Sequence, residues 1–266
     1  MVQGDGRLAG GAVQVLQRSA RILDCFTSDR AQLRASDVRE ATNLPGTTVA
    51  RILHTLVSEN LLQRHGDRYS IGLRVMSWAA AADAASDLIA ASQPALDALR
   101  NRCNESCAVY VRQGNMRVAV AHAMSTQSIV YQGRVGQILP LNQGAAGKVL
   151  MAFDSAARRE AEGALPGEGE GDRDEDPNLT RTLAEVRDRG WALSIEEREV
   201  GLNSMAAPIY GVEGFVIAAL SIGAPSFRLT PKVAESLSPV LIRYASAISQ
   251  RMLSTANGVA SEEPVT

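Results

Sequence analysis

The sequence has very little cysteine and no long apolar run, and both absences limit what the protein can be. Only Cys25, Cys103 and Cys107 occur among 266 residues. Such a sparse, odd set argues against a disulfide framework and fits a reducing compartment. No apolar stretch approaches the ~18 residues that a membrane-spanning helix needs, and the polar start at 1–11 has no apolar signal segment. We therefore expect a cytoplasmic protein without membrane contact.

Signatures of enzymes and of metal sites are also missing. The chain has no Gly-x-Ser-x-Gly motif, no phosphate-binding loop and no Cys/His cluster at metal-ligand spacing. Cys103, Cys107 and His122 leave open a nucleophile with its base or a zinc site, but buried structural thiols are the simpler interpretation. We expect neither catalysis nor a metal or other cofactor, and metal analysis of the purified protein tests the zinc alternative.

Composition and charge indicate two folded parts that carry net charges of opposite sign. Hydrophobic residues make up 45% and charged residues 21% of the chain, as in ordinary globular proteins, and the length suits two domains. Residues 1–75 hold ten Arg and seven acids, a balance of +3, whereas the remainder balances at −5. A slightly basic N-terminal part is compatible with nucleic-acid contact. We expect a flexible leader at 1–11, a first domain at 12–72, a linker helix at 73–91, a second domain at 92–254 and a flexible tail at 255–266.

The first domain is predicted to contain three helices and a β-hairpin. Apolar spacing and turn residues predict helices at 13–27, 36–42 and 45–59, strands at 61–64 and 68–71, and one continuous Ala-rich helix at 73–91. Val15 and Leu16 fall on the apolar face of the first helix. Ser36 is the expected N-cap of the second helix and Asn43 its left-handed end. Pro45 fits the first turn of the third.

The second domain alternates hairpins with helices. The predicted strands are 106–112, 116–122, 128–134, 191–195, 203–209 and 215–223, and the predicted helices are 144–153, 155–162, 178–189 and 231–254. The Gly- and acid-rich stretch 163–178 is expected to be a solvated loop. Hairpins with helices gathered between them favour an α+β domain on an antiparallel sheet.

Two short helices, a tight turn and a hairpin predict a winged helix-turn-helix. The apolar stripe of the third helix faces the core, so its polar face is held outward and can enter a major groove. Thr47 and Thr48 can hold phosphate in the first turn, and Arg51 has the reach and fork for guanine. Further candidate DNA contacts are Arg64, His65 and Arg68 on the wing and Arg18 and Ser19 on the first helix. A dimerisation or scaffold module remains the alternative.

Short motifs along nearly the whole chain resemble one family, the IclR-type bacterial regulators. In the first half they are Arg18-Ser19-x-Arg21-Ile22-Leu23, Leu44-Pro45-x-Thr47-Thr48-Val49-x-Arg51-Ile52-Leu53-x-Thr55-Leu56 and Tyr69-x-Ile71-Gly72. In the second half they are Leu139-Pro140-Leu141, Gly147-Lys148, Glu199-x-Gly201, Ala206-Ala207-Pro208-Ile209, Ala218-Ala219-Leu220-Ser221-Ile222 and Leu229-Thr230-Pro231. The match is specific because the motifs occur in the family's order.

The resemblance implies a GAF-like effector-binding domain, a linker helix and homodimers that can pair into tetramers. It also implies a palindromic double-stranded DNA operator and a small organic effector, often an organic acid or an aromatic catabolite. A repressor of a catabolic operon is the expected role. An activator of the same architecture is the first alternative, and an interaction module without DNA binding is the second. Duplex binding that weakens as salt rises argues against the second.

The resemblance also indicates where the effector binds. Matching positions give the pocket candidates Ser128, Tyr131, Ala145, Ala146, Ser204 and Ser221, with Ser194 and Glu199 as secondary candidates. Small residues at 144–147 leave helix-start N–H groups accessible to an anion or a carbonyl. The family's frequent Arg-Cys pair is Asn203-Ser204 here, and its acidic residue is Ser194. With no arginine nearby, we expect a neutral, amide-like or aromatic effector rather than a carboxylate.

Overall fold

Two compact units make up the protein. The computed structural model describes residues 13–27, 29–84, 86–162, 177–211 and 214–259, and the chain divides into Met1–Ala85 and Ser86–Thr266. The predicted leader at 1–11 and most of the predicted loop at 163–178 lie outside the described residues. Among the helices described, none combines the length and the hydropathy needed to cross a bilayer.

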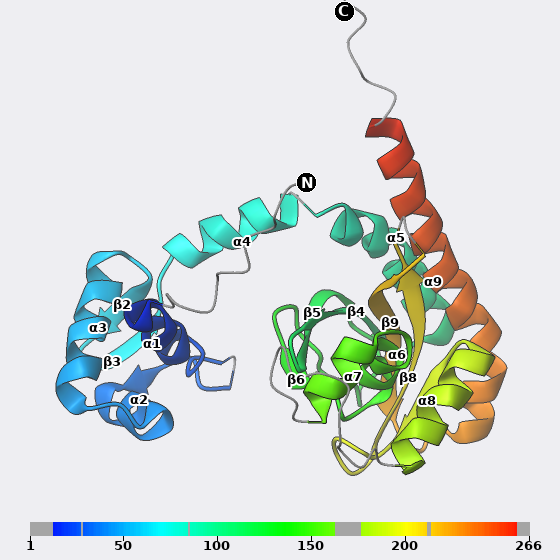
Figure 1. The fold of residues 1–266 in the computed structure, drawn as a ribbon, viewed down its shortest axis with the longest axis horizontal. Helices are drawn as coiled ribbons and strands as arrows, with labels where there is room; N and C mark the ends of the chain where they lie inside the picture. The colour runs from blue at the N-terminus through cyan, green and yellow to red at the C-terminus, as the bar shows by residue number, and fades with distance from the viewer. Residues whose placement is uncertain (1–12, 28, 85, 163–176, 212–213, 260–266) are drawn as a thin grey trace, which may run out of the picture. The chain divides into compact units, whose positions relative to one another are not determined.

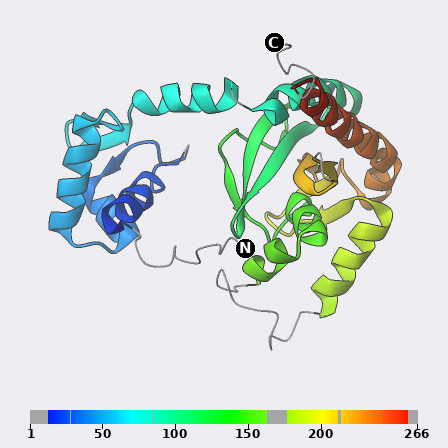
Figure 2. The same ribbon diagram turned by 45° about the horizontal axis from the view of Figure 1, so that its top comes forward.

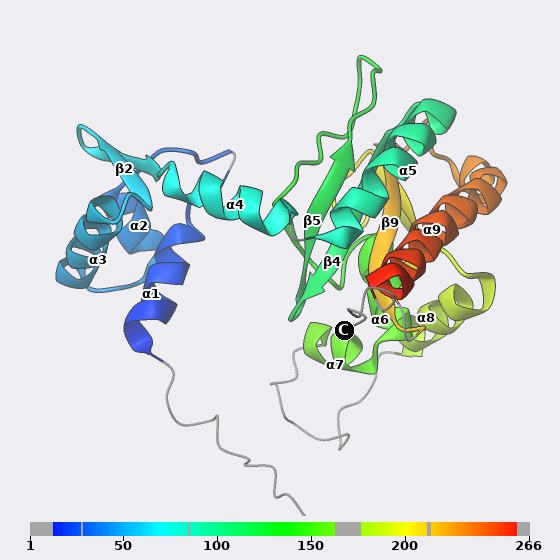
Figure 3. The ribbon, with the colours of Figure 1, turned by 90° about the horizontal axis from the view of Figure 1, so that it is seen from above.

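The first unit is a winged helix-turn-helix, as the sequence predicts (Figures 1 and 3). Its elements are α1 (Gln14–Leu23), β1 (Leu33–Arg34), α2 (Ala35–Thr42), α3 (Gly46–Ser58), β2 (Leu62–His65), β3 (Arg68–Ile71) and α4 (Arg74–Ala84). The strands form an antiparallel sheet in the order β1-β3-β2, in which the short β1 was not predicted. The β2–β3 hairpin is the wing.

The turn between α2 and α3 follows the sequence signals closely. Asn43 adopts the predicted left-handed conformation, with φ of 53°. Pro45 directly precedes α3 instead of lying in its first turn. The helix α2 begins one residue before its predicted N-cap Ser36, because the carboxylate of Asp37 reaches back and accepts a hydrogen bond (2.9 Å) from the backbone N–H of Arg34.

The core of the first unit contains the predicted stripe of α3 and only the end of α1. Its fully buried members are Ile22, Leu33, Val38, Val49, Ile52, Leu53, Leu56 and Leu62. The prediction for the first helix is partly wrong, since α1 is shorter than 13–27 and its Val15 and Leu16 are 50% and 67% exposed. Only the last turn of α1 packs against α2 and α3, so the start of the helix presents apolar side chains outward.

The prediction of one continuous helix over 73–91 is also wrong. The helix α4 ends at Ala84, and a second helix, α5 (Asp87–Cys103), begins after Ser86. Ser86 has extended backbone angles, and its hydroxyl accepts a hydrogen bond (3.3 Å) from the N–H of Ile89. A serine N-cap of this kind starts a new helix because it satisfies an otherwise unpaired N–H. The break coincides with the boundary between the units.

The second unit is an α+β structure on a six-stranded antiparallel sheet, which confirms the predicted fold class. After α5 its elements are β4 (Ser106–Gln113), β5 (Met116–Ala123), β6 (Ile138–Pro140), α6 (Ala145–Phe153), α7 (Ser155–Ala161), α8 (Pro177–Arg189), β7 (Ala192–Ile195), β8 (Leu202–Tyr210), β9 (Val216–Pro225) and α9 (Pro231–Val259). The strand order is β6-β5-β4-β9-β8-β7. Because α9 extends to Val259, the first residues of the predicted tail are helical.

The predicted strand at 128–134 is wrong, because the sheet ends instead at β6. Side chains satisfy the backbone of this segment in place of a neighbouring strand. The hydroxyl of Ser106 donates to the Tyr131 carbonyl (2.8 Å), and the guanidinium of Arg228 donates to the Ile129 carbonyl (2.6 Å). Arg228 also forms a two-point ion pair with Glu105, at 2.5 and 3.0 Å. These contacts fix Tyr131 beside β4.

Helices cover both faces of the large sheet and create two separate cores. The helices α5 and α9 lie side by side on one face (Figure 3), and their core includes Leu96, Leu99, Leu220, Leu241 and Ile248. The helices α6 to α8 lie on the opposite face (Figure 2), where Ala108, Tyr110, Leu141, Val149 and Leu183 are buried. The face toward α6 also carries the polar residues described below.

Gly72 provides a stability test for the first unit. A Cβ at this position would lie 2.1 Å from the carbonyl oxygen of Asn60, whereas at Gly46 the nearest atom is 3.7 Å away. We expect Gly72→Ala to lower the free energy of unfolding by about 1–3 kcal/mol, because the clash is with backbone. Gly46→Ala is the control and should be neutral or slightly stabilising in a helix. Equal urea unfolding curves for the two variants would contradict this packing.

Candidate DNA-binding surface and effector pocket

The outward face of α3 carries the residues predicted to contact DNA. Thr47 and Arg51 are exposed and Thr48 is half-buried, on the side opposite the buried stripe. Arg51 forms no ion pair with any described residue, so its guanidinium is not already committed to a carboxylate. The helix therefore presents hydroxyls in its first turn and a guanidinium one turn later, as contact with phosphate and base edges requires.

The wing and α1 present the remaining candidate contacts unequally. Arg64, His65 and Arg68 are all exposed on the β2–β3 hairpin, where Arg64 Nε donates to the carbonyl of Gly66 (2.9 Å). On α1, Arg18 is half-buried and its guanidinium donates to the Gln14 side chain (3.2 Å). The hydroxyl of Ser19 already donates to the Val15 carbonyl (2.8 Å) within the helix. These five residues stay predictions, with Ser19 the least available donor.

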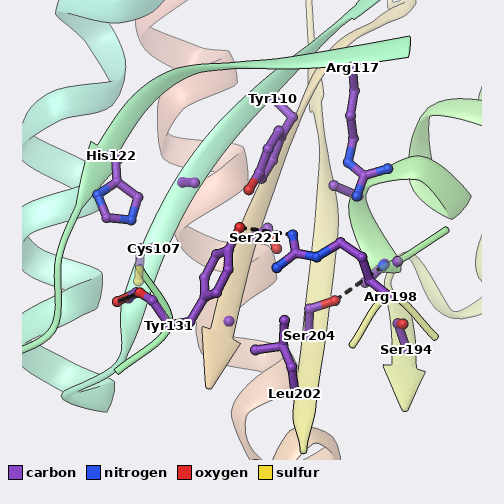
Figure 4. Close-up of a pocket in the computed structure, with 16 residues that line it drawn as sticks. Cys107, Tyr110, Arg117, His122, Tyr131, Ser194, Arg198, Leu202, Ser204 and Ser221 are labelled. Carbon is purple, nitrogen blue, oxygen red and sulfur yellow. Dashed lines mark hydrogen bonds between the residues drawn. The ribbon is translucent and has the colours of Figure 1, made fainter. Parts of the chain in front are cut away.

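The second unit contains a pocket against the face of the sheet that carries α6 (Figure 4). Its empty volume is about 490 Å³, which includes space open to solvent. Five of the six predicted effector residues line it: Tyr131, Ala145, Ala146, Ser204 and Ser221. Ser128 does not line it. Of the secondary candidates Ser194 lines this pocket, whereas Glu199 lines a neighbouring outer hollow.

The N-terminus of α6 forms one wall of the pocket. Gly144, with φ of 82°, precedes the helix, and the N–H of Ala145 donates to the Ser204 hydroxyl (3.3 Å). The N–H of Gly144 donates to the carboxylate of Glu197 (3.1 Å). Lys148, the first charged residue of α6, pairs with the same carboxylate. Glu197, the acid described at this helix start, is therefore already engaged.

Two arginines line the pocket that the sequence reasoning did not include. Arg117 of β5 is only 3% exposed, donates to the carbonyl of Pro140, and lies over the ring of Tyr110, 5.4 Å from its centroid. Burial lowers the pKa of Arg117 to about 10. Arg198 donates to the Tyr131 hydroxyl (2.8 Å) and stacks 4.5 Å from that ring's centroid. The expectation of a neutral effector, which rested on a missing arginine, loses its basis.

The contact between Tyr131 and Arg198 separates the pocket from the outer hollow. Both residues, together with Leu202, line the two spaces, and the outer one also carries the exposed side chains of Val200 and Phe227. Tyr131 lies close over β9, because a Cβ on Gly223 would be 2.9 Å from its ring. Glycine at this position lets the ring close against the strand.

A β-bulge explains why sequence periodicity missed Arg117. In the β4–β5 pairing, Tyr110 opposes Ala119 and Val109 opposes Ala121, so Val120 is an extra residue. Side chains alternate between faces along a strand, but one extra residue reverses the alternation. Arg117 and His122, five positions apart, therefore both line the pocket. A signal was present, since apart from Arg117 and His122 the strand holds only small and apolar residues.

The other titratable groups of the pocket wall are buried. Burial raises the pKa of Tyr110, and the nearby Tyr131 raises it further. Burial lowers the pKa of His122, whose Nε2 has no hydrogen-bond partner among the described residues. The sulfur atoms of Cys103 and Cys107 are 3.9 Å apart. The hydrogen bond from Cys107 lowers the pKa of Cys103, and burial raises that of Cys107.

A winged helix-turn-helix and a pocket lined by polar side chains in one chain define a class, the ligand-responsive DNA-binding regulators. The family model for the IclR helix-turn-helix domain matches residues 15–66, and that for the C-terminal region of the bacterial transcriptional regulator IclR matches 80–250. The chain belongs to the IclR family. It is a transcriptional regulator rather than an enzyme, with a DNA-binding helix-turn-helix and a C-terminal domain that binds a small organic effector.

Several relatives match most of the chain. The Pca operon regulatory protein of Acinetobacter baylyi is 28% identical over 222 residues, covering 81% of this chain and 80% of its own. The repressor AllR of Escherichia coli is 28% identical over 228 residues, covering 84% of each. An IclR homolog from Microbacterium hydrocarbonoxydans, crystallised with 4-hydroxybenzoate, is 26% identical, with a TM-score of 0.73, covering 90% of this chain and 99% of its own.

The half-buried His122 predicts a pH dependence of stability. Its pKa is lowered in the folded protein, whereas in the unfolded chain it is about 6.5. Between these values the unfolded state binds more protons, so acidification below about pH 6.5 destabilises the folded state. We expect His122→Gln to remove part of this loss when unfolding free energies are measured by urea titration across pH. The exposed His54→Gln is the control, and an unchanged pH dependence in His122→Gln would refute the prediction.

Proposed function

We propose that this protein represses a catabolic operon by binding a palindromic operator as a homodimer or dimer of dimers, and that a small organic effector controls the binding. The observation that carries the proposal is the uncommitted polar face of α3, with Thr47, Thr48 and Arg51, in a chain that also holds a polar pocket. The names of the relatives support a catabolic and repressing role, since they include an operon regulator and a repressor.

The relative crystallised with 4-hydroxybenzoate makes hydroxybenzoates the first effectors to test. The direct experiment is a footprint on the intergenic DNA beside the gene, with and without the substrate of the neighbouring pathway. Protection of two symmetric half-sites that the substrate removes supports repression. Protection that the substrate strengthens, together with increased transcription, supports an activator instead. Absence of any salt-sensitive duplex binding would exclude both.

Exposed apolar side chains in the first unit support self-association. Leu16 on α1 and Leu73, Met76 and Trp78 at and along α4 are each more than half exposed. Large apolar side chains left exposed are candidates for association sites, and a two-fold interface uses the same surface of both copies. A homodimer built on these residues presents two α3 helices, as a palindromic operator demands.

Arg51 tests the DNA-binding proposal. We expect Arg51→Ala to lose about 1–3 kcal/mol of discrimination between the operator and a scrambled duplex, because a bidentate contact to guanine contributes that much. Fluorescence anisotropy with labelled duplexes at several salt concentrations measures both affinities. The exposed Arg102→Ala in the second unit is the matched control. Equal discrimination by the Arg51→Ala variant and the control would remove Arg51 from the base-reading set.

Leu16 tests the self-association proposal. Leu16→Glu places a charge among the exposed apolar residues of the first unit and should weaken the dimer, because a charge in an apolar interface is costly to desolvate. Sedimentation velocity measures the dimer fraction across protein concentrations. Gln17→Glu adds the same charge at the next position of α1 and serves as the control. A dimer fraction that falls equally in both variants, or in neither, would contradict the proposed interface.

A further inference from the structure

Two of the buried polar atoms without a partner line the same pocket. Among the described residues, four buried side-chain nitrogen or oxygen atoms lack a hydrogen bond, and these include Arg117 Nε and His122 Nε2. We propose that the effector is a hydroxylated aromatic carboxylate, with its carboxylate bound at Arg117 and its hydroxyl at His122. This inference rests on the proposed function and specifies the chemistry of its ligand.

The electrostatics at Arg117 favour an anion. No Asp or Glu is among the residues that line the pocket, whereas Arg117 and Arg198 both line it. The start of α6 adds the positive end of a helix dipole, and the nearest acid, Glu197, is already paired with Lys148. A guanidinium that is 97% hidden from solvent without a carboxylate is an unfavourable arrangement in a protein interior. A bound carboxylate supplies the missing charge.

The backbone around Arg117 reserves space for its guanidinium. A Cβ on Gly144 would lie 3.0 Å from Nη2, and a Cβ on Gly147 would lie 3.0 Å from Nη1. Glycine just before α6 and glycine within its first turn therefore leave room for the guanidinium beside the start of the helix. A carboxylate here meets a forked cation and helix N–H groups together, the combination that binds such groups most strongly.

The far end of the pocket offers a neutral partner. His122 is half-buried, and burial disfavours its charged form. A neutral imidazole provides one donor and one acceptor, which suits a hydroxyl better than a second carboxylate. Figure 4 shows His122 and Arg117 directed to the same side of β5, with the rings of Tyr110 and Tyr131 between their positions. Aromatic walls between two polar ends fit a ring that carries a polar group at each end.

Calorimetric titration of the full-length protein tests this assignment with matched probes. We expect 4-hydroxybenzoate or 3,4-dihydroxybenzoate to bind about 10-fold or more tightly than 4-hydroxybenzamide, which lacks the charge, since hydrogen bonds between charged groups contribute that factor. We also expect two further probes to bind more weakly than 4-hydroxybenzoate. Benzoate lacks the hydroxyl, and terephthalate carries a second carboxylate in its place. An amide that binds as tightly as the acid, or a panel with no binder, overturns the proposal.

Variants of Arg117 test whether this residue binds the carboxylate of the ligand. Arg117→Met should weaken the acid about 10-fold or more without affecting the amide, and Arg117→Lys should restore part of the loss. Arg112→Met, the cross-strand neighbour of Arg117 outside the pocket, is the control. His122→Phe should weaken 4-hydroxybenzoate but not benzoate. Loss of acid and amide binding alike in Arg117→Met would indicate a structural role.

Melting temperatures distinguish a variant that has lost ligand binding from one that has lost its fold. Arg117→Met removes an uncompensated buried charge, so the ligand-free variant should melt no lower than the wild type. If it fails to fold, the wild-type comparison of acid with amide still decides the question. A protein that binds none of the probes but protects its operator would refute this inference and leave the proposed function intact. A protein that binds the acids but no operator would refute only the proposed function.

Discussion

One extra residue in β5 determines which side chains the pocket of the second unit contains. The sheet of the second unit is covered on both faces, so each strand residue must fit either the apolar core under α5 and α9 or the polar face toward α6. With strict alternation, Arg117 and His122 would lie on opposite faces, and one of them would enter the apolar core. The bulge at Val120 removes this conflict. It also confines the polar groups of β5 to one side.

The same pocket contains a buried arginine that selection for stability alone would not favour. Arg117 is buried beside the positive end of α6, and two glycines in the helix start give it room. An apolar residue at 117 would suit a core better. Natural proteins keep such unfavourable groups where function needs them. Arg228, which pairs with Glu105, holds the segment of Tyr131 through its hydrogen bond to the Ile129 carbonyl.

Local patterns predicted what local interactions determine. The stripe of α3 and the left-handed Asn43 are where the sequence indicates. Five of the six residues that the family resemblance marked line the pocket. Errors arose where a tertiary contact overrides the pattern. The segment 128–134 has strand-like residues but is bound by Ser106 and Arg228 instead of a strand. Ser86 interrupts the Ala-rich stretch because its hydroxyl caps the start of α5, so that α4 and α5 are two helices instead of one. Arg117 was missed because a bulge cannot be read from alternation.

Along the chain, the helix α5 lies between the first unit and the residues of the pocket. It is 17 residues long, about 25 Å at 1.5 Å per residue, and runs from the unit boundary at Ser86 to the turn before Ser106. Ser106 lines the pocket and holds the backbone of Tyr131. A ligand that displaces Tyr131 therefore acts on the residue next to the end of α5. Such a ligand changes DNA affinity only if it binds two arrangements of this segment with different affinities. A ligand with equal affinity for both arrangements leaves their populations unchanged, however tightly it binds.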